Sequence, residues 1–165
     1  MAVYNDYVDS NIRNGRPTSA IAAQGSRTVS GRVVFNTANG DSAGSIYRVL
    51  KGIPCTAVFQ KLDIYTNGVT GMSDVDVCLY KNQAGGAEVG TEVLASTLDL
   101  SSAVTAASPK NGLGNVTNAN RAKMLWELAG QSISNRQAFY DVGLRSVGAI
   151  TEADTVVVDY AYWAP

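Results

Sequence analysis

A strictly alternating stretch near the middle of the chain constrains the fold more than any other feature. Within residues 73–81, apolar and polar side chains alternate in the run Asp74-Val75-Asp76-Val77-Cys78-Leu79. Successive side chains of a β-strand point to opposite sides of its sheet, so this pattern predicts a half-buried strand with one solvent-facing side. A sheet with one wet face is usually antiparallel, and it needs a second layer over its dry face.

Similar alternation recurs on both sides of this stretch. The expected strands cover residues 28–36, 45–50, 56–65, 73–81, 97–100, 139–147 and 154–163. We expect 56–65 and 73–81 to form a hairpin, because the connection between them contains the turn-forming pair Asn67-Gly68. The Gly52-Ile53-Pro54 segment is expected to interrupt the second strand, since Pro54 cannot donate to a central ladder.

The alternation also assigns side chains to faces. In 56–65 the pattern places Val58 with Leu62 and Ile64, and it places Phe59 on the opposite face. In the last strand, Tyr160 and Tyr162 share the inner face with two valines. Several charged side chains are expected on solvent-facing sides. They are Lys61, Asp63, Asp141, Arg145 and Asp159.

One short helix is expected late in the chain. Asn118 or Asn120 can cap its start, Leu125 and Leu128 lie three residues apart on one side, and Gly130 can end it. Residues 101–116 are rich in Ser, Ala, Gly and Asn and predict a long loop. Many short strands with one helix predict an all-β fold, an antiparallel β-sandwich or jelly roll with one short helix and an extended N-terminal arm.

The arm is assigned to residues 1–28 and the β-sandwich domain to residues 29–165. Residues 1–28 are polar and poorly periodic, with Asn14-Gly15 and Pro17 among their breakers. Two interpretations stay open: a disordered tail, or an arm that becomes ordered against a partner. Four apolar or aromatic side chains could anchor such an arm. They are Tyr4, Tyr7, Val8 and Ile12.

Composition excludes several classes of function. The 165 residues contain no histidine, which removes the commonest general base and metal ligand. The net charge is −1 without a dense basic run, so nucleic-acid binding is not expected. The chain lacks a secretory signal and any run near the ~18 apolar residues of a membrane span, so we expect synthesis in a cytoplasm and no membrane contact. Cys55 and Cys78 are expected to remain reduced, structural thiols.

Asp74 and Asp76 are the strongest candidates for chemistry. They lie on one strand face with a rise of roughly 6.6 Å between them, which would suit two catalytic carboxyls or shared calcium ligation. A calcium site needs about six to eight oxygens, and no loop concentrates them. The solvated face of a structural strand is therefore favoured. We expect no enzymatic activity, no catalytic residues, no metal and no cofactor.

Aromatic residues near the C-terminus are better candidates for recognition. Tyr160 and Tyr162 are expected to pack inside the sandwich, whereas Trp163 is expected at an interface, where tryptophan is a favoured anchor. An alternative is a carbohydrate- or receptor-binding module that stacks sugars on aromatic side chains. The candidate platforms are Trp163, Tyr65, Tyr80 and Tyr47.

Five stretches after Ile53 follow one another in a characteristic order, at residues 74–80, 92–100, 125–130, 140–144 and 154–160. This order resembles the small β-sandwich capsid decoration (cement) proteins of tailed bacteriophages; residues 1–50 lie outside the resemblance. It implies a non-enzymatic virion protein on the outer capsid surface that binds the major capsid protein and clamps neighbouring subunits. We also expect self-association into a dimer or trimer.

Overall fold

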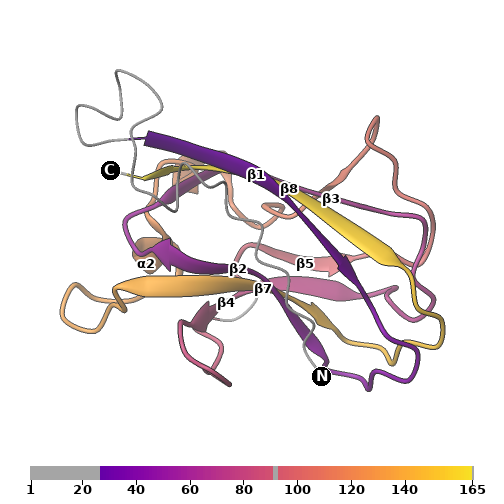
Figure 1. Ribbon diagram of the computed structural model, residues 1–165. Helices are drawn as coiled ribbons and strands as arrows, with labels where there is room; N and C mark the ends of the chain where they lie inside the picture. The colour runs from indigo at the N-terminus through magenta and orange to yellow at the C-terminus, as the bar shows by residue number, and fades with distance from the viewer. Residues whose placement is uncertain (1–26, 91–92, 165) are drawn as a thin grey trace.

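The computed structural model describes residues 27–90 and 93–164, which form two β-sheets packed face to face (Figure 1). The strands are β1 (Arg27–Asn36), β2 (Ile46–Pro54), β3 (Val58–Thr66), β4 (Val75–Lys81), β5 (Ala95–Leu98), β6 (Lys110–Asn111), β7 (Phe139–Ser146) and β8 (Thr155–Ala164). One sheet has the order β1-β8-β3-β6 and the other β2-β7-β4-β5. Every pair of neighbouring strands is antiparallel.

The strand pairing defines a jelly roll. The first strand pairs with the last, β2 with β7, β3 with β6 and β4 with β5, as if one long hairpin had been rolled over itself. Rolling places alternate pairs in opposite sheets, which is the double Greek key of jelly-roll folds. The predicted all-β sandwich or jelly roll is confirmed, whereas the predicted arm lies almost entirely outside the described residues.

The predicted hairpin of residues 56–65 and 73–81 is wrong, because β3 and β4 lie in different sheets. Val69 and Met72, in the connection between them, are fully buried. The Val69 amide donates to the carbonyl of Leu100 (2.9 Å), and the Leu100 amide donates to the carbonyl of Met72 (2.8 Å). The apolar side chains therefore carry the connection across the end of the sandwich, and the Asn67-Gly68 pair does not reverse the chain within one sheet.

Two irregularities of strand pairing were also not predicted from the sequence pattern. β2 continues through Pro54, because it is an edge strand whose pairing with β7 shifts register twice. In β3, a register shift between Phe59 and Lys61 offsets the inward and outward alternation of side chains at the start of the strand by one residue. Phe59 is consequently buried opposite Tyr162, and Val58 lies on the outer face beside Trp163.

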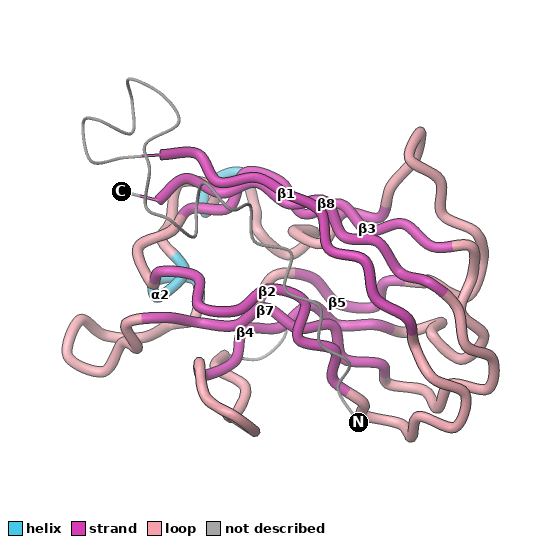
Figure 2. Tube along the Cα trace, in the orientation of Figure 1, coloured by secondary structure: helices cyan, strands magenta, loops and turns pink. Residues whose placement is uncertain are grey.

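The helical region is shorter than expected. It consists of the 3₁₀ turn η2 (Asn118–Asn120) and the single α-helical turn α2 (Leu125–Leu128), which lie among the loops at the ends of the sheets (Figure 2). The Glu127 carboxylate accepts the Met124 amide (2.8 Å), and the Leu125 amide donates to the Ala57 carbonyl (3.0 Å). Tertiary hydrogen bonds therefore hold a helix too short to be stable alone. No described helix is long and apolar enough to cross a membrane.

The two sheets meet in one hydrophobic core. Valine and leucine side chains of β4 and β7 point inward from one sheet, and Tyr160 and Tyr162 point inward from the other, as predicted. Phe35 of β1 stacks on Tyr47 of β2 with 5.3 Å between ring centroids, so an aromatic pair joins the sheets. Each fully buried large apolar side chain contributes about 1.5–3 kcal/mol, which makes this core the main source of stability.

Gly143, in the middle of β7, is required by a close approach on the outer side of its sheet. A Cβ atom at this position would lie 2.7 Å from Cε2 of Tyr80 and 3.2 Å from Cγ2 of Ile46. The Tyr80 ring therefore lies flat across the strand where β7 has no side chain.

The substitution Gly143→Ala is expected to lower the free energy of unfolding by about 1–3 kcal/mol, because the new methyl group overlaps Tyr80. Gly114→Ala is the control, since its Cβ would have no neighbour closer than 3.5 Å. Urea denaturation of both variants measures the difference. Equal stability of the two variants would contradict the packing described for Tyr80.

Candidate functional site

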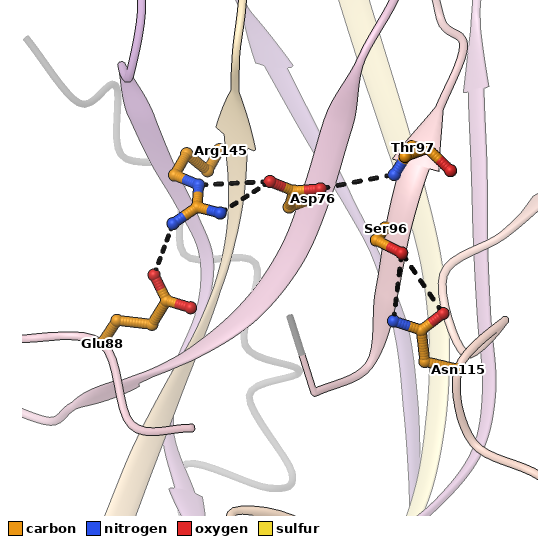
Figure 3. A network of polar contacts seen from close by, with 6 residues as sticks. All are labelled: Asp76, Glu88, Ser96, Thr97, Asn115 and Arg145. Atoms are coloured by element: carbon orange, nitrogen blue, oxygen red, sulfur yellow. Dashed lines mark hydrogen bonds and ion pairs between the residues drawn. The ribbon is translucent and has the colours of Figure 1, made fainter. Parts of the chain in front are cut away.

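The outer face of the β2-β7-β4 sheet is polar but buried. Asp76 of β4, predicted to face solvent, is 3% exposed. Its Oδ2 accepts two hydrogen bonds from Arg145 of β7, from Nη2 at 2.7 Å and from Nε at 3.3 Å (Figure 3). The predicted solvent-facing side of the 73–81 strand is therefore wrong. The arginine on the neighbouring strand neutralises the carboxylate, and this pairing allows the burial of a charge.

The pair belongs to a wider network that includes the neighbouring segments. Arg145 also donates from Nη1 to Oε2 of Glu88 (2.7 Å), and Oδ1 of Asp76 accepts the backbone amide of Thr97 (3.3 Å). Figure 3 shows Arg145 between the two carboxylates, with Asp76 reaching on towards β5. The hydrogen bonds that Arg145 donates to Asp76 raise the pKa of Arg145, so the guanidinium remains charged at every accessible pH. The network fixes Glu88 and Thr97 against the sheet.

A second arginine holds the loop after β4. Arg48 of β2 donates to Oδ2 of Asp141 (3.0 Å) and to the carbonyls of Gln83 and Gly86 (2.6 Å each). Asp141, which was predicted to face solvent, is 1% exposed. Its buried position is possible because both of its oxygens accept hydrogen bonds, Oδ1 from the Gly52 amide (3.0 Å). The 82–86 loop is thereby fixed by its backbone carbonyls.

Cys78 and Tyr80 lie between these two arginines. Both are buried, and Cys78 and Cys55 are free thiols, as expected. Burial is the main reason that the pKa of Cys78 is raised to about 12, with the Glu88 carboxylate adding to the effect. The thiol is therefore protonated at neutral pH and is a poor nucleophile. These side chains complete a covered face rather than an exposed reactive site.

Asp74 and Asp76 do lie close to each other, as the sequence suggested. Together with Gly44, Thr97, Arg145 and Val147 they line a pocket of about 400 Å³. Asp76, however, already uses both oxygens in hydrogen bonds, Oδ2 with Arg145 and Oδ1 with the Thr97 amide. Among the described residues, no group of three or more carboxylates and cysteines is placed to hold a metal ion.

Within the described part of the chain, the outer face of the other sheet is open. No described strand lies beyond β1, β8 and β3 at the top of Figure 1. The register of β8 with its two neighbours sets side chains of this face in rows across the sheet. The rows are Thr28, Trp163 and Val58; Ser30, Ala161 and Lys61; Arg32, Asp159 and Asp63; and Val34, Val157 and Tyr65. We call these twelve side chains the open face.

A polar network crosses the centre of the open face. Arg32 donates from Nε (2.6 Å) and Nη2 (2.8 Å) to the two oxygens of Asp159, and Tyr65 donates its hydroxyl proton to Oδ2 (2.9 Å). The Arg32 hydrogen bonds hold the pKa of Asp159 below its ordinary value. This contribution to stability is therefore present above the unfolded-state pKa of about 3.9 and is lost as pH falls through the lowered pKa.

The open face is hollowed next to this network. Ser30, Gly31, Arg32, Lys61, Asp159, Tyr160 and Ala161 line a shallow pocket of about 430 Å³. Ser30 and Ala161 are small, and the longer Arg32 and Lys61 stand beside them, so the sheet forms a dip with basic groups at its margin.

The aromatic candidates separate into two groups. Trp163 is half-buried on the open face, and Tyr65 is also on this face. Tyr47 and Tyr80 are fully buried and cannot serve as stacking platforms, which corrects the expectation for those two positions. The predicted contact residues Tyr4, Tyr7, Val8 and Ile12 lie outside the described residues.

Arg32 was missed as a candidate, although the alternation of its strand placed it opposite the buried valines. Its partner Asp159 is 127 positions away, and this pairing becomes visible only when β1 lies beside β8. No family model matches the chain, and no significant match was found among curated proteins or among solved structures. The function must therefore be inferred from the geometry of the chain itself.

The two arginine–aspartate pairs should differ strongly in their contribution to stability. Arg145→Met is expected to lower the free energy of unfolding by about 3–5 kcal/mol, because the Asp76 carboxylate would stay buried without its partner. Arg32→Met removes a pair whose arginine side chain is 61% exposed and screened by water, so a much smaller loss of stability is expected than for Arg145→Met. Urea denaturation at pH 7 compares them, and equal losses would contradict the distinction between a covered and an open face.

Proposed function

We propose that this chain is a non-enzymatic structural protein of a bacteriophage virion that attaches to the outer capsid surface and stabilises contacts between major capsid proteins. The observation that carries the proposal is the contrast between the two outer faces of the sandwich. One is covered by the 82–86 loop and buried ion pairs, whereas the open face is accessible over three adjacent strands. A broad sheet face with mixed polar and apolar side chains suits attachment to another protein.

Trp163 is the proposed anchor of this attachment. Tryptophan is enriched among the residues that dominate binding energy, because its large ring buries much area with little loss of side-chain freedom. Thr28 and Val58 lie beside Trp163 in the same row and would surround it in a complex. Two positive and two negative side chains, Arg32, Lys61, Asp63 and Asp159, sum to zero charge. Apolar contact would therefore supply the affinity, and the charges would set orientation.

Repetition on a capsid would strengthen a modest single contact. A particle presents many copies of the same coat surface, and a chain that touches two neighbouring subunits gains the effective concentration of the second contact. A jelly roll with a continuous core keeps the open face in one shape during binding. The stretches that resemble capsid decoration proteins include β5, α2 and most of β4, with parts of β7 and β8, and this resemblance supports a scaffold of this kind. Self-association into a dimer or trimer stays a prediction.

The test is binding to empty capsid shells of the phage that encodes this chain, measured by cosedimentation. Wild type is expected to saturate the shells, and Trp163→Ala is expected to bind about 30-fold more weakly, because truncation of an anchoring tryptophan removes about 2 kcal/mol or more. Ile133→Ala is the matched control, since Ile133 is a 72% exposed apolar residue outside the open face. Absence of wild-type binding, or equal binding of all three proteins, would contradict the proposal.

The alternative function is carbohydrate or receptor binding by the same face. Trp163 and Tyr65 remain accessible for stacking, and Arg32, Lys61 and Asp159 line the neighbouring pocket with polar groups that could bind hydroxyls. A glycan array probed with wild type and Trp163→Ala distinguishes the two functions. Glycan binding that depends on Trp163, in a protein that ignores the shells, would favour the alternative.

A further inference from the structure

The covered outer face of the β2-β7-β4 sheet opens into a pocket where β4 begins. The pocket has a volume of about 400 Å³ and is lined by Gly44, Asp74, Asp76, Thr97, Arg145 and Val147. Arg48 and Asp141, which hold the neighbouring 82–86 loop, are not among the lining residues. The pocket therefore lies outside the part of the face that this loop covers.

The register of the strands explains why the sheet is hollow at this place. Val75 of β4 pairs with Ser146 of β7. Asp74 and Val147 follow as the next pair, and the Val147 amide donates to the Asp74 carbonyl (3.0 Å). On the other side of β7, the Gly44 amide donates to the Ser146 carbonyl (2.8 Å), and a Cβ atom at Gly44 would have no neighbour within 4 Å. The row therefore carries side chains at two positions and leaves open space at the third.

Asp74 brings an unbalanced negative charge to the pocket. Arg145 pairs with Asp76 and with Glu88, so its single positive charge already faces two carboxylates (Figure 3). Among the described residues Asp74 forms no ion pair, and its Oδ1, which the protein encloses, accepts no hydrogen bond. Enclosing a carboxylate oxygen without a donor costs free energy. Because Oδ1 is shielded from water, a positive charge at Oδ2 would be stabilised more strongly than at a fully hydrated carboxylate.

The pocket is apolar directly beside this carboxylate. Val147, the cross-strand neighbour of Asp74, is 47% exposed. Thr97 is exposed on β5 and adds a hydroxyl group that can accept a hydrogen bond. A ligand that matches these three groups needs a compact cation for the carboxylate and a hydrocarbon chain for the valine.

We propose that this pocket binds an alkylammonium group, which is a primary ammonium on an unbranched hydrocarbon chain, as carried by a lysine side chain or a free polyamine. The ammonium would donate to Oδ2 of Asp74, and the chain would lie over Val147 and the space at Gly44. A guanidinium matches the site less well, because its paired donors suit a carboxylate with both oxygens available.

A metal ion is a poorer ligand for the same pocket. Calcium needs about six to eight oxygen ligands, and both oxygens of Asp76 are already used in hydrogen bonds. In the part of the chain that the structure describes, no group of three or more acidic residues or cysteines is placed to hold a metal. A metal ion would also leave the apolar surface of Val147 without a contact.

The inference goes beyond the proposed function and does not rest on it. The pocket and the open face lie on the outer faces of opposite sheets. Attachment to a capsid through the open face would therefore leave the pocket accessible. A chain fixed on a particle could then hold an amine-bearing partner on its other side.

An NMR titration of the wild-type protein with butylammonium chloride at low ionic strength tests the site. We expect the amide signals of Thr97 and Val147 to shift with a dissociation constant on the order of 1 mM, since a small ligand with one partly exposed ion pair binds weakly. Butyrate, which has a chain of the same length and the opposite charge, should leave both signals unchanged. No shift with butylammonium, or equal shifts with butyrate, would overturn the proposal.

The variant Asp74→Asn removes the charge and keeps the shape of the side chain. It should bind butylammonium about tenfold more weakly or worse, because the charge-assisted hydrogen bond is lost. Asp63→Asn is the matched control, since Asp63 pairs with Lys61 on the opposite sheet, and it should bind like wild type. Equal binding by Asp74→Asn and wild type would contradict the proposal. Calcium chloride that shifts the same signals at lower concentration would replace it with a metal site.

Two further ligands distinguish the sources of the ammonium. Nα-acetyl-lysine N-methylamide presents it as a protein does, and spermidine presents it as a free polyamine. Binding of the lysine derivative as tight as that of butylammonium identifies a protein side chain as the ligand, whereas binding of spermidine alone identifies a free polyamine. Binding of neither would overturn the proposal. These titrations use no capsid shells, so their failure leaves the proposed function standing, and failure of shell binding leaves the amine site standing.

Discussion

Two arginines on the outer face of the β2-β7-β4 sheet determine how the rest of the molecule is arranged. Arg145 joins Asp76 to Glu88, and Arg48 joins Asp141 to the carbonyls of the 82–86 loop. A buried carboxylate is tolerated only when it is paired and hydrogen-bonded, so each arginine makes one buried aspartate possible. The β2-β7-β4 sheet is therefore covered on its outer side as well as on its core side. The outer face of the opposite sheet remains as the broad accessible surface.

Local patterns predicted much of the fold, because they depend on neighbouring residues. The alternation of 73–81 and of the last strand corresponds to β4 and β8, and the many short strands with a single helix predicted an antiparallel sandwich. The position of each strand within the sheets, and the neighbours of its side chains, were harder to predict from the sequence. Asp74 and Asp76 look equivalent in sequence, but Asp76 alone meets an arginine 69 positions away. Likewise, the register shift near Phe59 depends on the pairing of β3 with β8, which no local pattern records.

The candidate site was likewise only partly predictable from local sequence patterns. Trp163 was identified from its chemistry and its place in an alternating strand, and it lies on the open face. Arg32 gains its importance only from Asp159 and Tyr65, which come from two other strands. The open face is a property of the assembled sheet. The proposed functional surface is formed by three strands that are distant in sequence. No single segment of the chain therefore predicts it.

The claim that the open face is the attachment surface can be tested by hydroxyl-radical footprinting of the free protein and of the protein bound to capsid shells. Our account predicts that oxidation of Trp163 and Tyr65 falls on binding, whereas oxidation of the exposed Ile133 and Phe139 is unchanged. Unchanged oxidation of Trp163 and Tyr65, with protection of Ile133 and Phe139, would contradict it and would place the contact at the connection between α2 and β7.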